Sequence, residues 1–144
     1  MPKRAYRKAR KMTPTIREAK AEDTRLIHSS WHTSYWANHA KKRIDREVYK
    51  SFQDSRIKYL LTFCPVLVAY FEEVPDEILG WACYGRDTLH YIYVRGSYRR
   101  RGIGSGLVPS GLTYYTHATD TVGGKFLAHH NLVFNPYRLE PHYG

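Results

Sequence analysis

The sequence predicts a single α+β domain in which helices flank a central sheet, with the element order βααβββαβαβ. Three observations support this prediction. The chain has 144 residues, enough for one domain with an ordinary core. Apolar residues recur every four positions near the N-terminus, which is helical spacing, and follow strand patterns in the middle of the chain. Gly and Pro separate these segments at intervals that are typical of a compact fold.

The first third of the chain is predicted to form one strand and one helix. The strand is expected at Thr15–Ala19, and the helix begins at Glu22-Asp23 because acidic residues favour a first helical turn. Ile27, Trp31 and Tyr35 then mark one helical face.

A second helix is expected to begin near Asp45 and to end before Pro65. The side chains expected to point inward from it are Val48, Phe52, Ile57, Leu60 and Leu61.

Three strands are expected to follow as a meander, with a turn at Pro75-Asp76. They are predicted at 66–71, 78–84 and 88–94. The remaining elements are expected to be a helix at 103–110, a strand at 112–116, a helix at 121–130 and a strand at 132–137.

Charge is concentrated at the N-terminus. The net charge is +10, and residues 3–11 contribute six basic side chains with no acidic one. We therefore divide the chain into a basic arm, 1–13, and a folded domain, 14–144. The arm is interpreted either as a contact for a polyanionic or protein partner or as a solvated leader, and a targeting presequence is a third option.

Membrane association and a disulfide framework are not expected. No apolar run is long enough to span a bilayer and no secretory signal is evident, so we expect a cytoplasmic protein. Cys64 and Cys83 are far apart in apolar surroundings, and we expect both to be reduced core residues.

A strand followed by a glycine-rich turn and a helix start is the central motif of the sequence. Gly102 and Gly104 allow close approach of the backbone to a ligand, and Arg99 is the first of three consecutive arginines beside them. The free N–H groups at the start of a helix, together with these arginine side chains, are suited to binding a diphosphate. The alternative is a tight turn with a solvated basic rim.

Residues 91–108 resemble the acetyl-CoA motif of the GNAT superfamily of N-acetyltransferases. Its signature, Arg or Gln, two residues, Gly, one residue, Gly or Ala, is matched by Arg99, Gly102 and Gly104. The resemblance extends over about 15–137 and implies a single mixed, mostly antiparallel sheet flanked by helices. Residues 132–137 also resemble phage-encoded members, which would place the protein in the host cytoplasm or the virion.

The resemblance implies that acetyl-CoA binds here and that an amine of a small molecule or protein attacks its thioester directly. A main-chain N–H on the strand 92–94 is then expected to stabilise the oxyanion. The residues predicted to contact acetyl-CoA are Ile92, Tyr93, Val94, Arg99, Arg100, Arg101, Gly102, Ile103, Gly104 and Ser105.

Two residue types that often serve catalysis in this family are missing. No glutamate occupies the strand 88–94, so His90, placed by alternation on the face of Ile92 and Val94, is predicted as the base, with His117 as second candidate. Leu127 stands where the resemblance expects a tyrosine acid. The alternative function is therefore a weak or inactive GNAT-fold protein serving as a phage accessory, virion or interaction component.

The first helix is expected to line the acceptor cleft, as it does in the family. Its predicted acceptor-binding residues are His32, Ser34 and Tyr35. His28 and His32 stand one turn apart, as zinc ligands often do, but no third ligand is evident and no metal is expected.

Overall fold

Six strands form one sheet in the order β1-β2-β3-β4-β5-β6. The structure, a computed structural model, describes residues 13–41, 43–99, 102–117 and 126–138. The strands are β1 Thr15–Glu18, β2 Val66–Phe71, β3 Val74–Tyr84, β4 Thr88–Val94, β5 Tyr114–Tyr115 and β6 Val133–Phe134. Strands β1 to β4 pair antiparallel, whereas β5 pairs parallel with both β4 and β6. The predicted mixed, mostly antiparallel sheet is confirmed.

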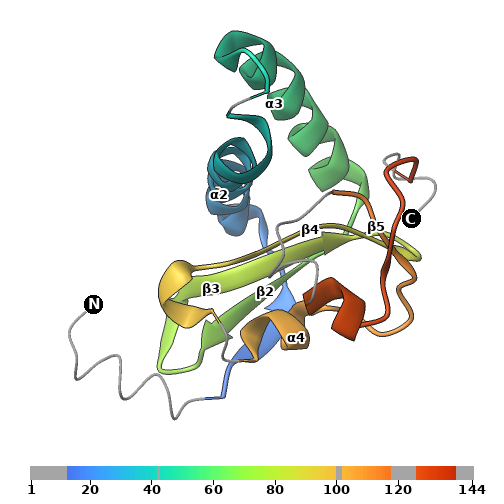
Figure 1. Ribbon diagram of the computed structural model, residues 1–144. Helices are drawn as coiled ribbons and strands as arrows, with labels where there is room; N and C mark the ends of the chain where they lie inside the picture. Colours follow the sequence, from blue (N-terminus) through green and yellow to red (C-terminus); the bar gives the residue numbers. More distant parts are fainter. Residues whose placement is uncertain (1–12, 42, 100–101, 118–125, 139–144) are drawn as a thin grey trace.

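Helices cover both faces of the sheet (Figure 1). Helices α2, Thr24–Tyr35, and α3, Arg46–Phe63, lie on one face, and the short α4, Ile103–Leu107, lies on the other together with a helical turn at 126–129. Each face has its own apolar core, one containing Trp81 under α2 and α3 and the other containing Leu107 of α4. The sheet therefore separates two chemically distinct layers.

Capping and ion pairing explain where the two long helices begin. The Asp45 carboxylate accepts hydrogen bonds from the N–H groups of Glu47 and Val48, at 3.1 and 3.3 Å, and so caps α3. A 3-10 turn, η1 at Ala21–Asp23, precedes α2, and the Asp23 carboxylate is 2.7 Å from the Arg17 guanidinium of β1. This pair holds the pKa of Asp23 below its usual value and ties β1 to the start of α2. A π-helical turn, η2 at Trp36–Ala40, extends α2.

Helix α3 buries a different face from the one expected. Ile57 and Leu60 are buried as predicted, but Val48 is 49% and Phe52 is 74% exposed, so those two predictions are wrong. The inward position in the first half of α3 is instead Tyr49, whose hydroxyl donates to the main-chain carbonyl of His32 on α2. The helix is thus oriented by its contact with α2.

Several boundaries also differ from the prediction. The turn between β2 and β3 falls at Glu72-Glu73, because Pro75-Asp76 already belongs to β3. Helix α4 ends at Leu107, and Val108 is extended because it precedes a proline. The last two strands have two residues each.

Some predicted features cannot be compared with the structure. The first twelve residues of the basic arm, and 121–125 of the predicted helix 121–130, lie outside the described residues. Within the residues that are described, no helix combines the length and the apolar character that crossing a membrane requires.

Candidate functional site

Strands β4 and β5 separate halfway along β4. Thr88 and Leu89 pair with Tyr114 and Tyr115, but within the described chain residues 91–94 have no partner in β5. The last contacts before the separation come from Thr116, whose N–H donates to the Leu89 carbonyl at 3.3 Å and whose hydroxyl donates to the His90 carbonyl at 3.4 Å. The second half of β4 therefore presents an unpaired edge.

Two amides of this edge point into the opening. The Arg95 N–H donates to the Leu79 carbonyl of β3 at 2.9 Å. Because successive amides of a strand point to opposite sides, the N–H groups of Ile92 and Val94 point away from β3 and toward the opening. The expectation that main-chain donors are available between 92 and 94 agrees with this arrangement.

A tight loop leads from β4 to α4. The Arg99 guanidinium folds back and donates to the Val94 carbonyl at 2.9 Å, which fixes the loop against the end of β4. Gly102 has φ +80°, a left-handed conformation that a residue with a Cβ adopts only under strain. The first helical bond runs from Gly106 N–H to the Gly102 carbonyl at 3.0 Å, so the amides of 103–105 begin the helix without intrahelical acceptors.

Small residues allow the turn 126–129 to pack closely against α4. A Cβ on Gly104 would lie 3.2 Å from Cζ of Phe126 in the turn 126–129. The Ser105 hydroxyl lies 3.2 Å from Nε2 of His130, a residue that follows the same turn. Two predicted contacts, Arg100 and Arg101, lie outside the described residues.

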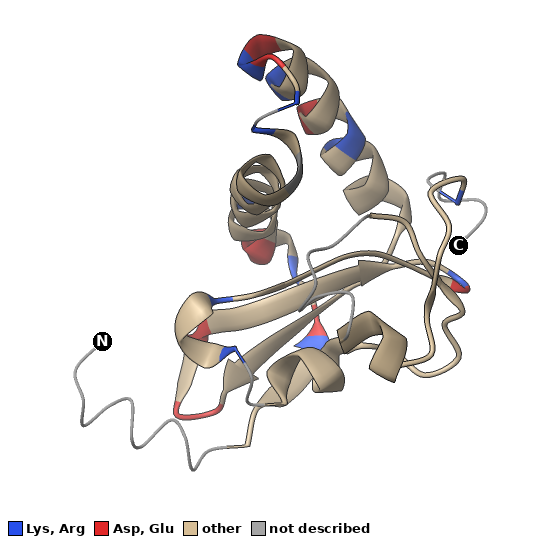
Figure 2. Ribbon diagram, viewed as in Figure 1, with Lys and Arg blue, Asp and Glu red and all other residues tan. Residues whose placement is uncertain are grey.

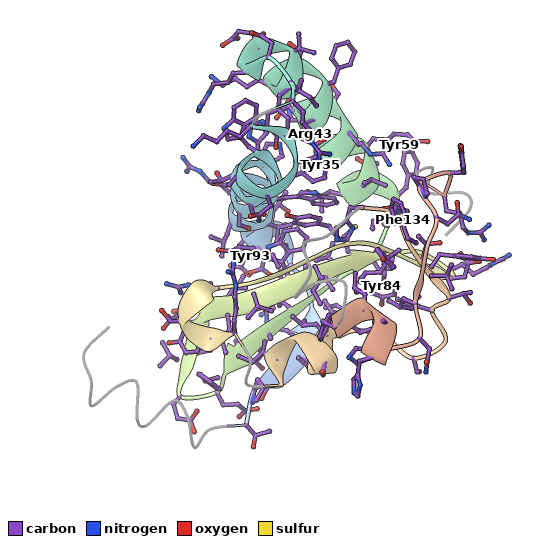
Figure 3. The ribbon with its side chains drawn as sticks, viewed as in Figure 1. Tyr35, Arg43, Tyr59, Tyr84, Tyr93 and Phe134 are labelled. Carbon is purple, nitrogen blue, oxygen red and sulfur yellow. The ribbon has the colours of Figure 1, made fainter. Side chains whose placement is uncertain are left out.

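Aromatic rings and one hydroxyl line the other side of β4, facing α2. The Tyr91 hydroxyl is hydrogen-bonded to the Ser34 hydroxyl at 2.8 Å, and the Tyr91 ring stacks on Trp31 with ring centroids 5.3 Å apart. Tyr35 lies against the same tyrosine at 6.0 Å. Figure 3 shows Tyr35 on the helical side of this layer and Tyr93 on the sheet side. Ser34 and Tyr35 therefore both contact Tyr91.

Burial makes Tyr91 a weaker acid than a free tyrosine. It is 4% exposed, and this burial raises its pKa to about 12, while the bond from Ser34 acts in the opposite direction. The phenol is consequently neutral at physiological pH. The ring of His117, which follows β5, lies 4.9 Å from the Tyr91 ring. His117 thus flanks the opening from the β5 side and Tyr91 from the β4 side.

His90 does not share the face of Ile92 and Val94. Cys83 pairs with Tyr91 and Tyr84 pairs with Leu89, so His90 is the extra residue of a β-bulge. The bulge breaks the alternation, and Leu89 takes the place on the α4 face where His90 was expected. The His90 ring is instead buried beside Cys64 at the end of α3.

His32 is also separated from the other predicted acceptor-binding residues. It lines a groove of about 530 Å³ between α2 and α3, together with His28 and Asp54. His28 Nε2 lies 2.8 Å from the Asp54 carboxylate, and burial lowers the pKa of His32. Across the described ranges, no three His, Cys, Asp or Glu side chains are arranged to hold a metal ion.

Acidic side chains are rare around the opening. Strand β4 contains no Asp or Glu, and Figure 2 shows the acidic positions on other segments, among them the β2–β3 turn and α3. Leu127, which replaces the expected tyrosine, is 1% exposed and packs in the α4-side core, so it supplies no proton. The site thus consists of main-chain donors, phenols, a hydroxyl and His117. Sequence reasoning did not single out Tyr91, because a strand aromatic is usually a packing residue.

The family of the chain follows from a comparison with known protein families. The model of the acetyltransferase (GNAT) family matches residues 22–122, which is more than half of the chain. The chain therefore belongs to the GNAT acetyltransferase family. The matched range contains α2, the open edge of β4 and the Gly102 turn.

Solved structures share the fold at low sequence identity. A protein of Pyrococcus furiosus assigned as an acetyl transferase is 19% identical, with a TM-score of 0.64 over 84% of this chain and 93% of its own. A GCN5-related N-acetyltransferase from Rhodopseudomonas palustris is 18% identical, with a TM-score of 0.57 over 82% and 81%. AAC(6')-Iy, in complex with a bisubstrate analogue of CoA, is 14% identical, with a TM-score of 0.53 over 84% and 91%. No curated protein matches the sequence.

Proposed function

We propose that this protein binds acetyl-CoA in the opening between β4 and β5 and transfers the acetyl group to an amine of a small molecule or protein. The observation that carries the proposal is the unpaired edge of β4, where Ile92 and Val94 direct two amides into the opening beside the Gly102 turn. A sheet edge inside a fold normally has its amides paired. Here a ligand with amide and thioester carbonyls would satisfy them.

The Gly102 turn is suited to the diphosphate of the same ligand. The amides of Ile103, Gly104 and Ser105 start α4 and are free of intrahelical acceptors, and amides in that position bind phosphate oxygens. Arg99 is exposed, and its guanidinium holds the loop in place by donating to the Val94 carbonyl. We therefore assign Arg99 to loop geometry and the backbone of 102–105 to phosphate contact.

Acetyl transfer requires an oxyanion donor and a neutral amine. The Ile92 or Val94 amide supplies the donor as the thioester carbon becomes tetrahedral. We assign His117 as the base that takes the proton of the amine, because it lies beside Tyr91 on the α2-facing side of the opening. His90 is not assigned this role, because its ring is buried beside Cys64.

The acceptor is expected to contact Ser34, Tyr35 and Tyr93, which lie between α2 and β4. His32 is left out of the acceptor site because it lines the groove between α2 and α3. The alternative function, a GNAT-fold protein without transferase activity, is favoured by the carboxylate-free β4 and by Leu127.

Calorimetry with acetyl-CoA tests the binding step. Gly102→Glu places a bulky anion in the phosphate turn and should weaken binding by about tenfold or more. Gly111→Glu is the matched control, because Gly111 also has a positive φ, of +87°, and free space around it but lies after α4. Equal binding by wild type and both variants would contradict the proposed site, and no binding by the wild type would favour the inactive alternative.

A thiol-release assay over a panel of amines tests the chemical step. His117→Ala should lower kcat, because the proton of the amine then loses its side-chain acceptor, while acetyl-CoA affinity stays unchanged. His90→Ala is the comparison, with little effect on kcat expected. A larger loss of kcat in the His90 variant than in the His117 variant would reverse the assignment.

A further inference from the structure

Two cysteines and a histidine meet where α3 ends against the sheet, and we call Cys64, Cys83 and His90 the dithiol cluster. Cys64 follows the last residue of α3, and its N–H donates to the Leu60 carbonyl at 2.8 Å. Cys83 lies on β3, where it pairs with Val66 on one side. Both thiols are free and buried in the same apolar cluster, and the Tyr84 N–H, next to Cys83, donates to the Pro65 carbonyl, next to Cys64, at 3.2 Å. Cysteines far apart in the sequence are thus in contact.

The two thiols differ in acidity because one hydrogen-bonds to the other. Hydrogen bonding from Cys83 lowers the pKa of Cys64, and the His90 ring lowers it further. The same bond, together with complete burial, raises the pKa of Cys83. Cys64 is therefore the more acidic of the two thiols. The thiolate is the reactive form of cysteine.

His90 is an unusual neighbour for these thiols. Its side chain is 3% exposed, and neither ring nitrogen has a hydrogen-bond partner among the residues that the structure describes. A buried polar group without a partner costs about 1–3 kcal/mol. The fold keeps this imidazole beside the Cys64 thiol.

Small molecules reach only one of the two sulfurs. Cys64 lines a groove of about 1210 Å³ bounded by α2, the end of α3 and β1, whereas Cys83 is 0% exposed. Lys20, Arg25 and Lys58 line this groove together with Glu18 and Asp54, and the basic group that lowers the pKa of Cys64 is Arg56. The order of reaction follows from access, with Cys64 first and Cys83 second.

We propose that the dithiol cluster is a peroxide-sensitive site that closes reversibly into a Cys64–Cys83 disulfide. The Cys64 thiolate attacks one oxygen of hydrogen peroxide, the O–O bond breaks, and Cys64 sulfenic acid and hydroxide form. The Cys83 sulfur then attacks the sulfenic sulfur, and the hydroxyl group leaves as water with the Cys83 proton. In sum, two thiols and one peroxide give one disulfide and two waters. The site requires neither acetyl-CoA nor transferase activity.

Closure of this disulfide requires the backbone to shift at the Cys64 end. Val66 is the residue directly opposite Cys83, so Cys64 is a diagonal neighbour rather than a direct one. Disulfides need Cα atoms within about 7 Å, and diagonal neighbours are at about 7–8 Å. Cys64 lies between α3 and β2, outside both elements, and is therefore the partner that can shift.

Peroxide treatment of the full chain, followed by intact mass and thiol counting after denaturation, tests the proposal. The chain has two cysteines, so each variant is unambiguous. Wild type should lose both thiols and two hydrogens in mass, and dithiothreitol should restore them. Cys83→Ala should stop at a Cys64 sulfenic acid that dimedone traps, and Cys64→Ala should leave the Cys83 thiol unreacted under the same conditions.

Three results would overturn the proposal. They are retention of both thiols in the wild type, a persistent sulfenic acid on wild-type Cys64, and disulfides that link two chains instead of one. Because Cys83→Ala leaves a buried gap, each variant's fold is compared by thermal unfolding. Iodoacetamide labelling of native wild type gives a second measurement that needs no variant. Cys64 should be labelled about tenfold or more faster than Cys83, and equal labelling would contradict the assigned roles.

Discussion

Gly80 offers a sharp test of the geometry beside the β4 edge. Gly80 lies on β3 directly opposite Val94, and a Cβ built on it would be 2.6 Å from the Tyr93 carbonyl oxygen. The same Cβ would lie 3.2 Å from the Cδ1 atom of Leu107. Gly80→Ala must therefore push β4 away while α4 blocks movement on one side.

The expected cost is that of overpacking a tight core. Such insertions destabilise by about 1–3 kcal/mol, and here the obstacle is a backbone atom that no rotamer change can remove. For a chain of this size that corresponds to a fall in Tm of roughly 3–10 °C. Because Val94 is opposite Gly80, acetyl-CoA binding should weaken as well.

Thermal unfolding followed by circular dichroism measures the effect, with Gly96→Ala as the matched control. Gly96 has no atom within 4 Å of the added Cβ and no positive φ, so its variant should unfold within about 0.5 kcal/mol of the wild type. If Gly80→Ala is as stable as Gly96→Ala, the close pairing of β3 and β4 at this position is wrong.

Three further predictions concern stability. Asp45→Ala should cost about 1 kcal/mol in urea unfolding because α3 loses its cap, and an unchanged midpoint would argue against that cap. Ile57→Ala should lower the free energy of unfolding by about 2–5 kcal/mol, whereas Phe52→Gln should change it by no more than about 0.5 kcal/mol because that ring is exposed. The reverse order would support the buried face of α3 that the sequence predicted. Arg17 lowers the pKa of Asp23 in the folded protein below the value of about 4 that it has in the unfolded chain. The ion pair therefore stabilises the fold fully above a pH of about 4, and this stabilisation is lost as the pH falls through the lower pKa of the folded state. In Asp23→Asn the free energy of unfolding should accordingly fall less steeply as the pH is lowered below about 4. An unchanged pH dependence would contradict the role of the pair.

The functional proposals and the dithiol proposal fail independently. Loss of acetyl-CoA binding in Gly102→Glu concerns the α4 side of the sheet, whereas thiol oxidation concerns the α3 side. Cys83 nevertheless pairs with Tyr91, the residue before the Ile92 amide. If both proposals hold, the disulfide would form on β3, next to the strand β4 whose amides are proposed to contact acetyl-CoA.

Local pattern alone determined much of this protein. The predicted strands 66–71 and 88–94 have the observed bounds of β2 and β4, because an unbroken apolar run between turn residues leaves few alternatives. The Gly102 position was also readable, since its φ of +80° is a local requirement that glycine meets. The order of elements and the family followed from these segments.

Tertiary structure decided the features that depend on pairs of elements. A β-bulge is a property of two strands, so the displacement of His90 from the face of Ile92 could not be read from the alternation of β4 alone. The buried face of α3 was set by its packing on α2, which selected Tyr49 over Phe52. The meeting of Cys64 with Cys83 likewise required a helix end to be placed against a strand. Sequence spacing records neighbours along one element, whereas these contacts arise from how separate elements are arranged in space.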